Sequence, residues 1–243
     1  MQKNEIPWYE SWFDRNYLQL YQHRNSHEAN AQIDLIVRSV GLKKNQRILD
    51  LACGDGRYTH LLNSRGYRTV GLDLSRKLID EGLNKYGPLN LVVGDMRAIP
   101  GTYDIILSLF TSFGYFNEDS ENYRVFESVK SSLADGGWFW LDFLNPRFIE
   151  ENLVSETVTE ISSTCQVIER RQIVKNRIVK DIIFFDGSEE KRYQESVRLY
   201  SRNELESMFT QAGFKTAGCF GDYQGNQWQE HAERTIIYGK KRH

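Results

Sequence analysis

The chain has 243 residues and 40% of them are hydrophobic, which suits one large domain with a packed core. Its 31 Lys and Arg residues against 33 Asp and Glu residues give a formal net charge of -2. This balance argues against a nucleic-acid partner, because proteins that bind nucleic acid usually carry a basic excess. No apolar run is as long as a membrane span, and residues 1–10 show no secretory signal, so we expect a cytoplasmic protein with no membrane partner.

Three cysteines, Cys53, Cys165 and Cys219, lie far apart and have no metal-ligand spacing. We therefore expect structural thiols in a reducing compartment and no bound metal. Residues 1–27 are rich in aromatic and polar side chains, which predicts one or two short helices. We treat this stretch as an N-terminal cap segment.

Residues 28–144 alternate between amphipathic helices and apolar strands. Apolar residues three and four positions apart predict the helices, and Ser75 supplies a cap for one of them. The predicted helices are 28–40, 57–64, 75–86 and 118–133, and the predicted strands are 47–52, 68–73, 89–93, 103–109 and 138–144. This alternation predicts βαβ units, and therefore a parallel sheet with both faces covered.

The pattern changes after Pro146. Strand-like segments with short turns, and no helix between them, predict an antiparallel β meander over residues 157–200. Its strands are 164–174, 177–185 and 191–200, with turn signals at Lys175-Asn176 and Asp186-Gly187-Ser188. A capping box at Ser201 and Glu204 then begins a helix, and strands follow at 215–221 and 234–240. The meander is therefore an insertion in one α/β domain of residues 1–243.

Three signals follow three successive strands, at the sheet edge where open α/β sheets bind ligands. The glycine turn at 50–56 lets the backbone approach a ligand, and the next helix offers N–H groups to an anion; a plain strand-to-helix turn is the alternative. Asp73 is placed to accept ribose hydroxyls, unless it is a solvated loop aspartate. Asp95 is placed to meet the adenine amine while Met96 packs on the ring, unless Asp95 is a helix cap.

These residues resemble the class I S-adenosylmethionine-dependent methyltransferase family, in its small-molecule type. The matching stretches are 48–56 (ILDLACGDG), 70–75 (VGLDLS), 94–96 (GDM) and 103–106 (YDII). The resemblance covers about residues 30–145 and 195–240. It implies a Rossmann-like seven-stranded mixed sheet with helices on both faces, whose last two strands form an antiparallel hairpin. It also implies S-adenosyl-L-methionine as the cofactor.

The resemblance implies a set of cofactor-binding residues as well. Ala52 stands where the family usually has its first loop glycine, and this small residue keeps the site plausible. The other implied contacts are Gly54 and Gly56 on the methionine moiety, Asp73 on the ribose, Leu74 and Met96 around adenine, Asp95 on the adenine amine, and Phe110 near the sulfonium. In related enzymes an N-terminal segment closes over the cofactor, which implies roles for Tyr17, Tyr21 and Arg24.

Two other functions fit the same fold. An NAD-dependent oxidoreductase would need a Gly-x-Gly-x-x-Gly loop, but Thr59 stands at the last position. A non-catalytic nucleotide-binding domain would tend to lose part of the set formed by Gly54, Gly56, Asp73 and Asp95, and all four are present. We therefore expect a methyltransferase that acts on nitrogen or oxygen of a small-molecule acceptor.

The acceptor side is less defined, because methyl transfer needs in-line geometry more than a catalytic group. The aromatic segment 109–116 either walls off the methyl group or packs as ordinary core. No catalytic residue is assigned. The substrate-side candidates are Tyr115, Tyr17 and His231, and the alternative for His231 is that it is an ordinary surface histidine. The apolar meander either roofs the acceptor site or forms a homodimer interface.

Overall fold

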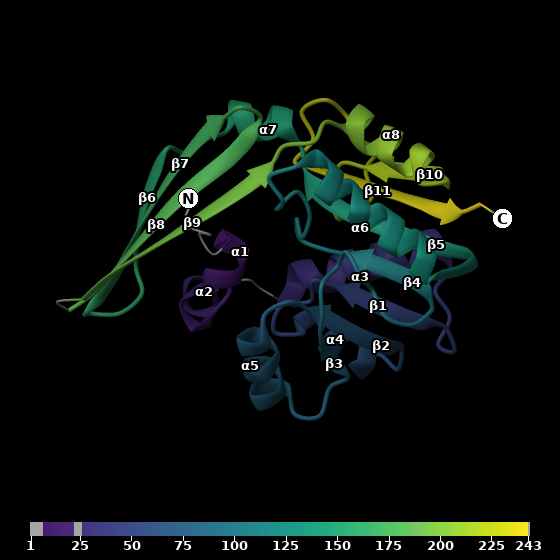
Figure 1. Cartoon of the computed structure of the whole chain (residues 1–243), viewed down its shortest axis with the longest axis horizontal. Helices are drawn as coiled ribbons and strands as arrows, with labels where there is room; N and C mark the ends of the chain where they lie inside the picture. The colour runs from purple at the N-terminus through teal and green to yellow at the C-terminus, as the bar shows by residue number, and fades with distance from the viewer. Residues whose placement is uncertain (1–6, 22–25, 188, 243) are drawn as a thin grey trace, which may run out of the picture.

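The computed structural model describes residues 7–21, 26–187 and 189–242, and its centre is a seven-stranded sheet (Figure 1). The strand order is β10-β11-β5-β4-β1-β2-β3. β11 is antiparallel to both of its neighbours, and the other adjacent pairs are parallel, so the predicted mixed sheet is confirmed. The strands are β1 (Arg47–Leu51), β2 (Arg68–Asp73), β3 (Leu91–Val93), β4 (Tyr103–Ser108), β5 (Leu133–Leu144), β10 (Phe214–Phe220) and β11 (Arg234–Lys241).

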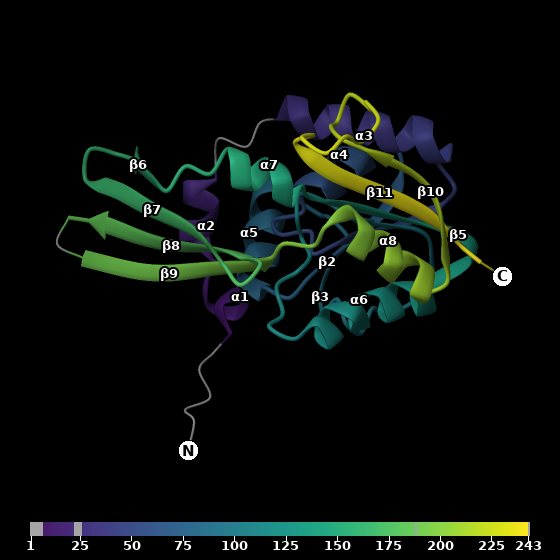
Figure 2. The ribbon, with the colours of Figure 1, turned by 90° about the horizontal axis from the view of Figure 1, so that it is seen from above.

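Helices cover both faces of this sheet (Figure 2). On one face Phe126 and Phe209 pack on the sheet residue Phe139, and on the other Ile36 and Leu62 belong to the cluster around Trp140. The helices are α6 (Asp119–Ser132) and α8 (Arg202–Gln211) on the first face, α3 (Ser26–Val40) and α4 (Arg57–Ser64) on the second, and α5 (Arg76–Tyr86) beside β2 and β3. Within the described chain, every helix is too short or too polar to span a lipid bilayer.

A second sheet contains four antiparallel strands in the order β6-β7-β8-β9 and projects from one end of the molecule (Figure 1). This is the predicted meander, with β6 (Glu156–Glu160), β7 (Cys165–Val174), β8 (Arg177–Asp186) and β9 (Glu189–Arg198). The turn between β7 and β8 uses positive φ at Lys175 (48°) and Asn176 (60°), as the sequence indicated. The short helix α7 (Pro146–Glu151) and the edge strand β6 were not predicted.

The N-terminal helices α1 (Trp8–Ser11) and α2 (Arg15–Leu20) lie beside the meander in both views (Figures 1 and 2). Trp12 is fully buried and forms a third hydrophobic cluster with Leu20 and the meander residues Val167, Ile182 and Phe184. We call α1, α2 and the meander together the roof, because they share this core.

β5 begins five residues earlier than the sequence predicts. The glycine pair at 136–137, which follows the predicted helix, lies inside β5, in the register irregularity between the pairs Tyr103–Leu133 and Ile105–Trp138, with Gly136 at φ 70°. A Cβ on Gly137 would lie 2.9 Å from the carbonyl oxygens of Ala134 and Asp104. These glycines therefore allow a close backbone approach within a strand.

Candidate functional site

The loop after β1 is compact because glycines let its backbone approach its neighbours. Gly54 has φ 60° and Gly56 has φ 76°, and Ala52 also adopts positive φ, at 56°. Two glycines outside the loop matter as well. A Cβ on Gly71 would lie 2.7 Å from the Cys53 sulfur, and one on Gly82 would lie 2.1 Å from the Asp55 carbonyl oxygen. The loop is thus held closely between β2 and α5.

Asp73, at the end of β2, joins this loop to the next helix. Its Oδ2 accepts a hydrogen bond from Gly54 N at 2.8 Å, and its Oδ1 accepts one from Ser75 N at 2.8 Å. The carboxylate is nearly buried, and burial raises its pKa despite the two N–H donors. Each carboxylate oxygen has a further lone pair, so Asp73 can still accept hydroxyl groups from a ligand.

Three cavities meet at this edge of the sheet. The first, the strand-end cavity, is lined by the ends of β2 and β3. The second, the loop cavity, is lined by the glycine loop and the start of α4. The third, the roof cavity, lies between the roof and the sheet and has about 1730 Å³ of empty space, including the open solvent at its mouth. Tyr17 and Tyr115 line all three, so the cavities meet at these two rings.

Asp50 provides a buried carboxyl group at the loop cavity. Its Oδ2 accepts a hydrogen bond from the Thr59 hydroxyl at 2.8 Å, which gives a structural use to the residue that departs from the dinucleotide pattern. Burial raises the pKa of Asp50 to about 7, because removing the carboxylate from water disfavours its charged form more than these hydrogen bonds favour it. The protonation of this group can therefore change near neutral pH.

Asp142 organises the turn after β4. Its Oδ2 accepts hydrogen bonds from Phe110 N at 2.9 Å and from the side chains of Gln32 and Tyr223, and its Oδ1 pairs with Arg234 at 2.7 Å. Phe110 has φ 53°, a left-handed conformation that costs energy for a non-glycine residue. The buried carboxylate therefore holds a strained turn. The residue at this turn, Phe110, lines the loop and roof cavities.

Comparison with known proteins finds methyltransferases. A family model described as a methyltransferase domain matches residues 48–137. The putative methyltransferase YqeM of Bacillus subtilis is 24% identical over 212 residues, 82% of this chain and 86% of the relative. The 18S rRNA (guanine-N(7))-methyltransferase of Bos taurus is 27% identical over 175 residues, 65% of this chain and 62% of the relative.

Solved structures of methyltransferases share the whole fold. The S-adenosylmethionine-dependent methyltransferase of Clostridium acetobutylicum has a TM-score of 0.78 at 20% identity and covers 94% of this chain and 97% of its own. The amino pentose methyltransferase of Micromonospora echinaspora was solved with S-adenosylmethionine bound. It has a TM-score of 0.68 at 18% identity, and the match covers 99% of this chain and 100% of its own. The methyltransferase-domain match and the relatives indicate that the chain is an S-adenosylmethionine-dependent methyltransferase.

The site of this methyltransferase presents polar groups that suit S-adenosylmethionine. The strand-end cavity has about 590 Å³ of empty space, with the open solvent at its mouth included. It presents the nearly buried Asp73 for hydroxyl groups. The loop cavity presents the Arg57 side chain and the start of α4, which suit a carboxylate, and Asp50, which suits an amine. When bound, the cofactor supplies a methyl group on a positively charged sulfur.

Most of the predicted cofactor residues lie around these cavities. The strand-end cavity is lined by Ala52, Gly54, Asp73, Leu74, Asp95 and Met96, and Ala52 and Gly54 continue into the loop cavity. Phe110 and Tyr21 line the loop and roof cavities. Asp95 is engaged by Arg97, whose hydrogen bonds outweigh the effect of burial and lower the pKa of the carboxyl. Any contact of Asp95 with adenine would therefore be made by an ion-paired carboxylate.

Other predicted residues lie elsewhere. Gly56 lines none of the three cavities; it begins α4, and a Cβ there would meet the Leu91 side chain at 2.9 Å. His231 is 64% exposed, pairs with Glu151 and lines none of the three cavities. Arg24 lies outside the described residues. The sequence reasoning missed Asp142 and Arg234, and the signal available was a pair of opposite charges within apolar strands.

Proposed function

We propose that this methyltransferase transfers the methyl group to nitrogen or oxygen of a small-molecule acceptor, and that an amine nitrogen is the preferred target. The observation that supports this best is the roof cavity, which meets the cofactor cavities at Tyr17 and Tyr115. Its wall also contains the rings of Trp8 and Phe13. Aromatic faces attract the ammonium form of an amine.

The residues of this cavity act by position and by excluding water. Burial strongly raises the pKa of Tyr115, so its hydroxyl stays protonated and serves as a hydrogen-bond donor instead of a base. No histidine among the described residues lines the roof cavity. An amine acceptor needs no strong base, because it can arrive already deprotonated. These features support nitrogen over a hydroxyl oxygen, whose proton must leave during the reaction.

The neighbouring charges favour a small acceptor over a nucleic acid. Among the residues that the structure describes, three cations line the roof cavity, and each has a carboxylate partner: Arg171 with Glu169, Lys180 with Glu195, and Arg234 with Asp142. A phosphate backbone would need unpaired cations. The similarity to an rRNA methyltransferase makes RNA the second candidate, and that relative is matched over only part of its length.

We also propose that the chain is one domain, with α1, α2 and the meander acting together as the roof of the acceptor site. The inner face of the meander supports this role, because α1 and α2 of the same chain cover part of it. A meander built mainly as a homodimer interface would be expected to bury its outer face, so the mass of the purified protein in solution tests this alternative.

Acceptor screening tests the proposed function. The purified protein is incubated with S-adenosylmethionine and a panel of amino sugars, simple amines, their hydroxyl isosteres and total RNA, and formation of S-adenosylhomocysteine is measured. We expect turnover with members of the amine group and little with their hydroxyl counterparts. Methylation of RNA alone, at a rate that small molecules do not reach, would overturn the proposal.

A further inference from the structure

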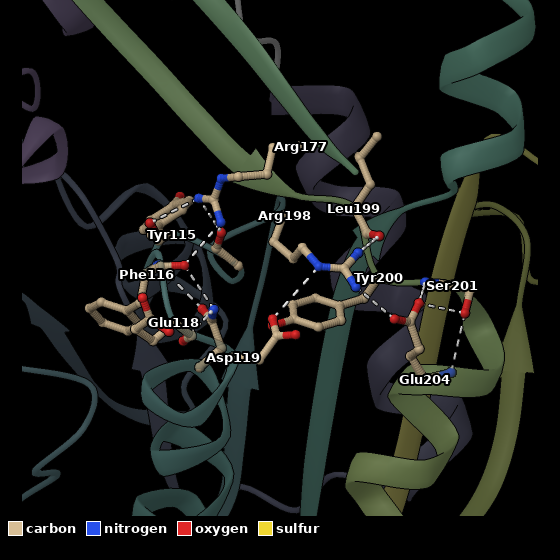
Figure 3. Close-up of polar contacts among 12 residues, drawn as sticks. Tyr115, Phe116, Glu118, Asp119, Arg177, Arg198, Leu199, Tyr200, Ser201 and Glu204 are labelled. Atoms are coloured by element: carbon tan, nitrogen blue, oxygen red, sulfur yellow. Dashed lines mark hydrogen bonds and ion pairs between the residues drawn. The ribbon is translucent and has the colours of Figure 1, made fainter. Parts of the chain in front are cut away.

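Arg177 joins the meander to the loop after β4. Its guanidinium donates hydrogen bonds to the carbonyl oxygens of three consecutive residues: Gly114 at 3.3 Å, Tyr115 at 3.2 Å and Phe116 at 3.0 Å (Figure 3). It also donates to the Ser196 carbonyl at 2.7 Å, and its Nε donates to the Ser196 hydroxyl at 2.8 Å. One side chain therefore links two strands of the meander to one loop.

The cation and the loop conformation depend on each other. In the described part of the chain, Arg177 forms no ion pair with a carboxylate, and burial lowers the pKa of its guanidinium. The carbonyl oxygens replace a counter-ion. Conversely, the three carbonyl dipoles repel one another where they converge, and the cation offsets this repulsion. Arg198 N and Asn122 Nδ2 also donate to two of them, Gly114 O at 2.8 Å and Phe116 O at 2.9 Å. Gly114 has φ 82°, and a Cβ there would lie 2.9 Å from the Arg198 carbonyl oxygen.

This loop carries two walls of the cofactor site. Tyr115 lines all three cavities. The ring centres of Trp8 and Phe13 lie 5.1 Å and 5.8 Å from the centre of its ring. Phe116 is buried and lines the strand-end cavity, where the Arg97 guanidinium lies 4.3 Å from the centre of its ring. A shift of the carbonyl groups held by Arg177 would therefore move both rings.

We propose that Arg177 is a positioning residue for methyl transfer. Through three consecutive carbonyl groups it fixes Tyr115 and Phe116, and it makes the shape of the cofactor site depend on how the meander is seated. This inference concerns the cofactor side of the site. It therefore holds for any acceptor, including RNA.

Arg198 provides a matched control, because it is a second largely buried arginine at the base of the meander. Its guanidinium pairs with Glu204 at 2.8 Å and Asp119 at 3.6 Å, and it also donates to the Leu199 carbonyl (Figure 3). Its side chain is 15% exposed, and its partners lie at the starts of α6 and α8. None of these partners lines the three cavities.

The experiment compares Arg177→Gln, Arg177→Lys and Arg198→Gln by calorimetric titration with S-adenosylhomocysteine, together with the Tm of each variant. We expect Arg177→Gln to bind about tenfold more weakly, because a charge-assisted network is lost. Arg177→Lys should bind about threefold more weakly, since an ammonium lacks the planar fork that reaches several carbonyls. Arg198→Gln should lose stability yet bind within about twofold of the wild type.

The pairing of affinity with Tm separates positioning from general stabilisation. Wild-type affinity in a folded Arg177→Gln variant overturns the proposal. Should that variant not fold, Arg177→Lys carries the test, and wild-type affinity there overturns it equally. An Arg198→Gln variant that loses as much affinity as Arg177→Gln at the same loss of Tm also overturns it, since any damage at the base of the meander would then weaken cofactor binding.

Discussion

The floor of the site, at the carboxyl ends of the sheet strands, is held in a different way from its roof. In the floor, buried carboxylates accept hydrogen bonds from backbone N–H groups of nearby turns. Asp73 binds Gly54 and Ser75 at 2.8 Å each, and Asp142 binds Phe110 at 2.9 Å. Hydrogen bonds from backbone N–H groups to a carboxylate are charge-assisted and therefore strong, so they fix the shape of the turn.

In the roof, side chains bind other side chains from distant parts of the sequence. Trp12 Nε1 donates to Glu195 at 2.6 Å, and Asn16 donates to the Tyr193 hydroxyl at 2.6 Å; each pair is separated by more than 170 positions. Lys180 lies between Glu195 and Glu169 at 3.0 Å and 3.3 Å, and these carboxylates keep its pKa raised although burial lowers it. The roof therefore depends on side-chain pairs that must assemble together, whereas in the floor the turns are held through their backbone N–H groups, and one of the carboxylates, Asp142, also pairs with the distant Arg234.

Removing the central carboxylate of the floor should have the largest effect on stability. Asp142→Ala leaves the Arg234 guanidinium buried without its partner, so we expect a loss of about 3 to 5 kcal/mol in the free energy of unfolding. Tyr223→Phe is the control, because it removes one hydroxyl donor to the same carboxylate and should cost about 1 kcal/mol. Urea unfolding measures both. A loss in Asp142→Ala no greater than in the control would show that the ion pair does not support the floor.

Asp50 should make stability depend on pH near neutrality. Its pKa rises from 3.8 to about 7 on folding, mainly through burial. A raised carboxyl pKa gives a stabilising contribution that is fully present below pH 3.8 and is lost as pH rises through 7. The wild type should lose free energy of unfolding between pH 5 and pH 8, whereas Asp50→Asn should not, because asparagine cannot ionise. We therefore expect the free energy of unfolding of the variant to rise by roughly 2 to 3 kcal/mol relative to the wild type over this range. A difference between the two proteins that is equal at both pH values would contradict the assignment.

Asp73 should matter for the cofactor more than for the fold. Asp73→Ala removes the acceptor of two loop N–H groups and the charged acceptor for ribose hydroxyls, so we expect binding of S-adenosylhomocysteine to weaken by about 1 to 3 kcal/mol. Asp104→Ala is the control, since Asp104 accepts a hydrogen bond from Arg47 N at 2.7 Å at the opposite, amino ends of the strands. Equal affinities of the two folded variants in calorimetric titration would remove Asp73 from the cofactor site.

Local sequence predicted the floor because its elements depend on neighbouring residues. Helix α4 (Arg57–Ser64) and strand β2 (Arg68–Asp73) were predicted to the residue, and the Ser75 cap is present. The meander was recognised from its turns, but β6 was missed, because residues 156–160 contain one apolar side chain, Val158, and lie at an exposed edge. Short polar edge strands carry no periodicity that sequence could reveal.

The side-chain pairs of the site were beyond local sequence for a physical reason. Asp142 and Arg234 meet because β5 and β11 pair in a register that sets Ile236 beside Asp142, two positions from Arg234. Lys180 and Glu195 are direct cross-strand partners, but only in the register fixed by the turn between β8 and β9. A shift of one residue would place these charges on the opposite face of the sheet. The sequence predicted the strands without their register.

Glu195 tests whether the roof can loosen while the floor keeps the cofactor. Glu195→Ala removes the acceptor of Trp12 and Tyr21, but Lys180 keeps Glu169 as a partner, so we expect a loss of only about 1.5 kcal/mol in stability. Amide hydrogen exchange in residues 8–20 should quicken, because α1 and α2 lose one of their polar links to β9, while the bond from Asn16 to Tyr193 remains. Affinity for S-adenosylhomocysteine should stay within about twofold of the wild type.

The control for this experiment lies on the same sheet. Glu156→Ala breaks an exposed ion pair with Arg170 and should change neither exchange nor affinity, since surface pairs contribute little. If Glu195→Ala instead lost cofactor affinity as strongly as Asp73→Ala, the roof would belong to the cofactor site, and the division between floor and roof would fail. Retained affinity with faster exchange would leave Arg177 as the point through which the meander acts on the floor.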